Sequence, residues 1–111
     1  MPEHDFSPLY DRYPGLIEKM PEVFTSHQFI LELVQANQTA YIEALYSYRH
    51  HVHRGAVAPF MAVHAILAQH LSNYPDRIEQ SRKDAPSVDI FGQESDCSEW
   101  RKRIRQIRFE I

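Results

Sequence analysis

The longest regular pattern of apolar residues runs from Thr25 to Gly55, where they recur every three or four positions. That spacing places them on one face of an α-helix. Thr25 and Gln28 have the spacing of a capping box, and Gly55 suits the left-handed position after a helix end. We therefore expect one long helix, bent at Asn37, and the alternative is two helices joined near Asn37. The apolar face comprises Ile30, Leu33, Val34, Asn37, Tyr41, Leu45, Tyr48 and Val52.

A second helical pattern covers Pro59–Ser72, with an apolar stripe on one side and small residues on the other. Such a helix is typically buried between neighbours on both sides. Ahead of the long helix, Pro14–Met20 predicts a short helix that ends before Pro21. Residues 1–13 contain two prolines and three aromatic residues, and we expect an irregular arm whose rings pack onto the body.

The pattern changes after the second helix, where Asp, Ser, Pro and Gly become frequent and apolar residues sparse. Val88–Ile90 alternates as a short strand does, and Arg77–Lys83 would either pair with it as a hairpin or extend a helix after Pro75. The segment Glu99–Ile111 fits both periodicities. Trp100, Ile104 and Ile107 favour a helix in this segment, whereas Ile107, Phe109 and Ile111 favour a strand.

These patterns predict a mainly α single domain over residues 1–111. It would consist of an arm (1–13), a helical core (14–74), an irregular or hairpin region (75–99) and a basic tail (100–111). One long helix would pack with a second helix and a short N-terminal one. The order of the elements also resembles the layout of a winged helix.

Composition narrows the class of protein. The apolar fraction of 43% and the charged fraction of 24% are those of an ordinary globular domain. Cys97 is the single cysteine, so neither an internal disulfide nor a cysteine-based zinc cluster is expected. No apolar run reaches the length of a membrane span, and the acidic N-terminus is unlike a secretory signal. We expect a cytoplasmic protein that does not enter a membrane.

The chain carries no pattern of a catalytic site. No serine has the flanking glycines of a nucleophile elbow, and the three glycines are too far apart to form a phosphate-binding loop. The acidic residues around Cys97 disfavour its thiolate. We therefore expect a protein that is not an enzyme and holds no cofactor.

The C-terminal tail is the best candidate for a functional site. Its five basic residues and one acidic residue after Trp100 give a net charge of +4, which leaves −7 for residues 1–100 of a chain whose net charge is −3. The basic residues alternate with apolar ones and would bind nucleic acid or an acidic partner. In the alternative, the tail docks on the acidic body of its own chain. The five basic residues are Arg101, Lys102, Arg103, Arg105 and Arg108.

Other hypotheses concern the helices. Pro59–Ser72 has no Lys or Arg, which counts against a DNA-groove helix, and its apolar and small-residue faces suit a protein partner or a homodimer instead. A histidine-ligated metal is a further hypothesis, with His50 and His53 as candidate ligands, although helix capping explains them as well. His64 lies within an apolar stripe and is expected to be a hydrogen-bonded core residue.

Four segments together carry a resemblance. They are Phe24–Ile30, Pro59–His64, Asp89–Gly92 and a following Trp100. Their succession resembles a family of short, uncharacterised bacterial single-domain proteins. The resemblance implies a bacterial intracellular protein and assigns a function to no residue.

Overall fold

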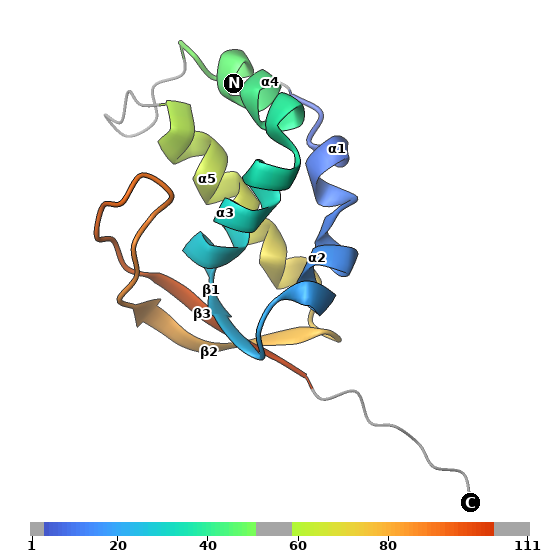
Figure 1. Ribbon diagram of the computed structural model, residues 1–111, viewed down its shortest axis with the longest axis vertical. Helices are drawn as coiled ribbons and strands as arrows, with labels where there is room; N and C mark the ends of the chain where they lie inside the picture. The colour runs from blue at the N-terminus through green and yellow to red at the C-terminus, as the bar shows by residue number, and fades with distance from the viewer. Residues whose placement is uncertain (1–3, 51–58, 104–111) are drawn as a thin grey trace, which may run out of the picture.

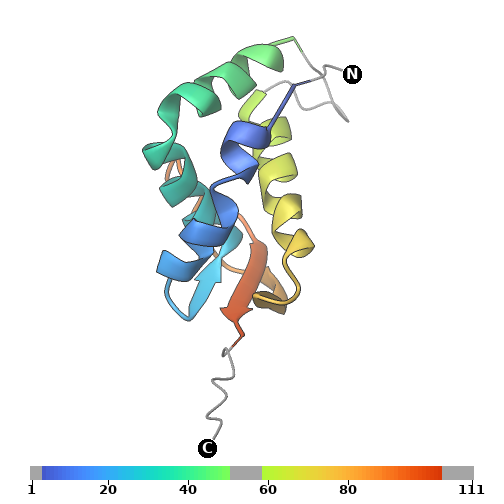
Figure 2. The ribbon, with the colours of Figure 1, turned by 90° about the vertical axis from the view of Figure 1, so that its right-hand side faces the viewer.

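The computed structural model describes residues 4–50 and 59–103, and it shows a small sheet with helices gathered on one side of it (Figures 1 and 2). The sheet has three strands in the order β1-β3-β2, and both pairings are antiparallel. The elements in chain order are α1 (Ser7–Tyr10), α2 (Tyr13–Lys19), β1 (Val23–Thr25), α3 (Ser26–Ala36), α4 (Gln38–Ser47), α5 (Pro59–His70), the 3₁₀ helix η1 (Leu71–Asn73), β2 (Ile78–Ala85) and β3 (Cys97–Lys102).

The prediction of a mainly α fold with a small C-terminal hairpin is wrong, because the fold is mixed α/β. The sheet is not confined to the C-terminal region, since β1 precedes the main helices and joins β3 from the other side. Val88 forms a single bridge with Glu94 inside the β2–β3 loop and does not belong to a strand. The first residues of the predicted tail belong to β3, the central strand.

The predicted long helix is also wrong, because the chain breaks at Asn37 into α3 and α4. Asn37 has a φ of −138° and a ψ of 54°, which are not helical, and its side-chain amide donates to the carbonyl of Leu33 at 2.9 Å. The helical region begins after Thr25, as predicted. Thr25 accepts from the backbone N–H of Gln28 and the Gln28 side chain accepts in return, which completes the capping box. The predicted end at Gly55 lies outside the described residues.

The remaining helices follow the sequence pattern more closely. The predicted helix Pro14–Met20 is present as α2, and Pro59–Ser72 is present as α5 and η1. The predicted arm is helical at α1 rather than wholly irregular, but its aromatic rings do pack onto the body: Phe6 and Tyr13 are buried. The Tyr13 hydroxyl donates to the carbonyl of Leu67 in α5 at 2.6 Å.

The sheet and the helices share one core. Phe24 of β1 lies opposite Trp100 of β3, and both side chains are buried against the helices together with Ile78 of β2. The Trp100 indole N–H donates to the hydroxyl of Ser26 in α3 at 2.9 Å, and this hydrogen bond is buried. It joins the central strand directly to the helical layer.

Replacing Ser26 by alanine should lower the free energy of unfolding by about 1–3 kcal/mol, because the buried indole N–H of Trp100 would lose its acceptor. In a W100F background the same replacement should be neutral or stabilising, since the hydroxyl then has no indole partner to lose. Urea denaturation of the four proteins in this double-mutant cycle measures the difference. An equal loss in both backgrounds would contradict the role given to this hydrogen bond.

Candidate interaction surface

The structure describes three of the five predicted tail residues. Arg101 and Lys102 lie in β3 and Arg103 follows it, whereas Arg105 and Arg108 lie outside the described residues. The described part of the tail therefore does not form the amphipathic helix that one periodicity predicted, because Arg101 and Lys102 are consecutive residues of a strand.

Lys102 is held by the backbone at the end of α2. Its ammonium group donates to the carbonyls of Glu18 and Met20 at 2.9 and 3.0 Å. Its own backbone N–H donates to the carbonyl of Glu22 at 2.8 Å. Because helix carbonyls in the last turn lack partners within the helix, a lysine suits this position. Lys102 thus stabilises the connection between α2 and β1.

The two arginines lie next to acidic residues of the same chain. Arg103 is 3.1 Å from the carboxylate of Glu79 and also donates to the carbonyl of Pro75, and Arg101 is 3.8 Å from Glu22. These ion pairs are half exposed, so each contributes little to stability. Within the described residues, both arginines are thus paired with acidic residues of their own chain.

The outer face of α5 is exposed and uncharged. Met61, Ala65 and Gln69 follow one another at helical spacing on this face, and half of the Met61 side chain is open to solvent. We call these three residues, with the partly buried residues beside them, the α5 face. The flanking residues are Ala62, Ile66 and Ala68. The prediction that neighbours bury the small-residue side of this helix is wrong for the described part of the chain.

Large apolar side chains are also exposed on two neighbouring elements. Ile42 and Tyr46 lie one turn apart on α4 with exposed fractions of 61% and 63%, and the guanidinium of Arg49 lies 3.8 Å from the centre of the Tyr46 ring. Val88 and Phe91 are exposed on the β2–β3 loop. Exposed apolar residues are ordinary when they occur singly, but a group of them indicates a contact surface.

The structure does not test the hypothesis that His50 and His53 hold a metal together. His50 is exposed just after α4, and His53 lies outside the described residues. In residues 4–50 and 59–103, no group of three or more His, Cys, Asp or Glu side chains could hold a metal ion.

His64 is a hydrogen-bonded core residue, as predicted. Its Nε2 atom is 2.6 Å from the hydroxyl of Tyr41 on α4, and its exposed fraction is 8%. Phe60 and Phe91 both contact the ring, with centroids 5.4 and 6.1 Å away. The pair could have been predicted, because Tyr41 and His64 carry polar atoms on the apolar faces of two neighbouring helices.

Burial controls the charge of His64. It lowers the pKa of this imidazole to about 4; the negative charge of Asp89 opposes the shift and His27 adds to it. Burial likewise raises the pKa of Tyr41 to about 12. Both partners are therefore neutral at pH 7. No sequence pattern indicated that Asp89 and His27 would lie near this pair, because they belong to the β2–β3 loop and to α3.

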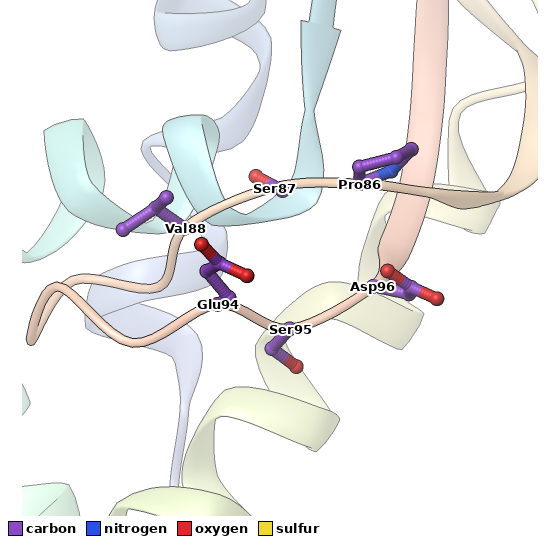
Figure 3. A pocket seen from close by; sticks show the side chains of 6 residues that line it. All are labelled: Pro86, Ser87, Val88, Glu94, Ser95 and Asp96. Atoms are coloured by element: carbon purple, nitrogen blue, oxygen red, sulfur yellow. The ribbon is translucent and has the colours of Figure 1, made fainter.

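A hollow of about 650 Å³ lies between the two arms of the β2–β3 loop (Figure 3). Its volume is that of a ligand pocket, but ligand pockets are mostly apolar and enclosed. Here one loop supplies every lining residue, Glu94 turns toward the arm of Val88, and Ser95 points away. Four of the six side chains that line the hollow are polar, and all but Ser87 are exposed. The lining consists of Pro86, Ser87, Val88, Glu94, Ser95 and Asp96.

Comparison with known proteins identifies no relative: no family model, curated protein or solved structure matches this chain. Within the described residues, no helix is long and apolar enough to cross a bilayer. The surfaces of the molecule are therefore the basis on which a function can be inferred.

Acid should destabilise the protein through His64. The folded-state pKa of about 4 is below the ordinary value of 6.5, so the unfolded state binds the proton first as the pH falls. This contribution to stability is complete above pH 6.5 and is lost between 6.5 and 4, on the order of 3 kcal/mol in total.

Urea denaturation of the wild type and a His64→Gln variant at several pH values from 7 to 4.5 checks this expectation. The difference in unfolding free energy between the two proteins should shrink as the pH falls. A difference that stays constant over this range would show that His64 is not buried in its neutral form.

Proposed function

We propose that the protein is a non-catalytic binding module that associates with a second copy of itself through the α5 face. What carries the proposal is that the outer face of α5 is exposed, apolar for the most part and free of Asp, Glu, Lys and Arg. A surface of this kind gains free energy when another apolar surface covers it.

The absence of charge on α5 favours a protein partner over a nucleic acid. Helices that enter a DNA groove normally supply Arg or Lys for phosphates and bases, and Pro59–His70 has neither. The tail is the other candidate for nucleic-acid binding. Arg101, Lys102 and Arg103 each have a partner within the chain, so no observation favours that function over self-association.

A second copy is the partner that the chemistry of the α5 face fits best. In a two-fold symmetric contact, residues near the axis lie close to their own copies, so a charged residue at the centre of the face would meet its like. Met61, Ala65 and Gln69 avoid this repulsion, and the glutamine side chain can both donate to and accept from its copy. Small residues beside them also let two helix axes approach closely.

The expected dimer is weak. Because α5 is about 18 Å long, a contact confined to it is smaller than a standard stable interface. We therefore expect a concentration-dependent equilibrium, with a dissociation constant in the micromolar range or higher.

Mass measurement by light scattering after gel filtration, with samples loaded at about 10 to 500 µM, tests the proposal. The apparent mass of the wild type should rise from 13.1 kDa toward twice that value as concentration increases. Ala65→Glu should remain monomeric, because it places two like charges together in the dimer. Thr39→Glu adds the same charge to an exposed position of α4 and should behave as the wild type.

A wild type that stays monomeric over the whole concentration range would contradict self-association. If the Ala65→Glu variant dimerises as strongly as the wild type, the α5 face is not the interface. A parallel titration with DNA and RNA at low salt addresses the tail. Binding that weakens steeply with added salt would support the nucleic-acid function in place of the one proposed.

A further inference from the structure

The β2–β3 loop, residues 86–96, rises from the sheet toward α5 and ends in a tight turn (Figure 1). One carboxylate oxygen of Asp89 accepts from the backbone N–H groups of Phe91 and Gln93 at 2.9 and 3.0 Å. Gly92 completes the turn with a φ of 84°, a conformation that glycine adopts without strain. These hydrogen bonds and the turn at Gly92 fix the local conformation of the loop tip.

Phe91 joins the loop tip to α5. Its ring lies edge-on to Phe60, with centroids 4.8 Å apart, and nearly parallel to the imidazole of His64 at 6.1 Å. Nearer the base of the loop, the Ser87 and Thr25 hydroxyls are 3.1 Å apart. The ring of Phe91 therefore covers a buried titratable group while more than half of its own surface stays exposed.

Among the described residues, three titratable neighbours of His64 come from three different elements. Tyr41 comes from α4, His27 from α3 and Asp89 from the loop itself. Asp89 is the neighbour that carries a negative charge. Its hydrogen bonds to the backbone of Gln93 and Phe91 lower its pKa below the ordinary value, so it remains ionised in mild acid.

We propose that the contact of Phe91 with His64 is an acid-sensitive latch, which opens when His64 is protonated and frees the loop tip from α5. A neutral imidazole packs beside the rings of Phe60 and Phe91, and one hydrogen bond to Tyr41 satisfies its Nε2 atom. An imidazolium has two N–H donors and a charge that aromatic surroundings solvate poorly. Moving Phe91 aside exposes the ring to water and to the carboxylate of Asp89.

The sheet stays closed when the latch opens, because other contacts hold its strands. Trp100 of β3 is bonded to Ser26, and Lys102 is bonded to the backbone of Glu18 and Met20. None of these contacts involves the loop tip. Opening changes the exposed surface beside α5 without unfolding the molecule.

Thermodynamic reciprocity gives a direct test. If protonation of His64 weakens the Phe91 contact, removal of the Phe91 ring must make His64 easier to protonate. The imidazole signals of His64 would be followed by NMR during acid titration of the wild type, Phe91→Ala and Val88→Ala. Val88 is a matched control, because it is an equally exposed apolar residue of the same loop.

Phe91→Ala should raise the proton affinity of His64 by about tenfold, and Val88→Ala should leave it unchanged. In the wild type, the backbone amide of Gly92 should titrate together with His64, and it should not titrate in a His64→Gln variant. His27→Gln should retain the Gly92 transition, which separates the two histidines. The latch is excluded if Phe91→Ala leaves the His64 titration unchanged, or if the Gly92 transition persists in His64→Gln.

Discussion

The described structure depends on β3 more than on any other element, because this strand is hydrogen-bonded along both edges. β1 pairs with one edge and β2 with the other. In the middle of the strand Trp100 reaches the helical layer and donates to Ser26. At its end Lys102 binds the carbonyls of Glu18 and Met20. Without β3, the two outer strands would not be joined in one sheet, and the core beneath the helices would lose Trp100.

The central position of β3 changes the interpretation of the basic residues that follow Trp100. Residues that look like a basic tail in the sequence begin inside the central strand, so Arg101 and Lys102 have structural positions before any partner binds. Within the described residues, the outer face of α5 is one of the exposed apolar surfaces. In the proposed module the sheet stays fixed. Self-association would cover the outer face of α5, and protonation of His64 would release the neighbouring β2–β3 loop.

Helix positions were largely predictable from the sequence, because capping and helical periodicity are local signals. The capping box of Thr25 and the start of α5 at Pro59 are examples. β2 was not predictable from periodicity, since six consecutive residues between Ile78 and Ala85 are exposed and show no apolar alternation. Its conformation depends on pairing with β3, which is a non-local contact. The hydrogen bond between Tyr41 and His64 could have been predicted from the sequence. Its neighbours Asp89 and His27 could not, because only folding brings the β2–β3 loop and α3 close to this pair.

The most direct test of the central role of β3 is native-state hydrogen exchange. The amide of Lys102, which donates to Glu22, and the other amides of β3 should exchange only through global unfolding, with protection equal to that of the α3 amides. The amides of β3 and those of α3 should give the same free energy of opening. Both values should fall by the same amount when denaturant destabilises the protein. Exchange of β3 through a local opening, while α3 remains fully protected, would contradict the account.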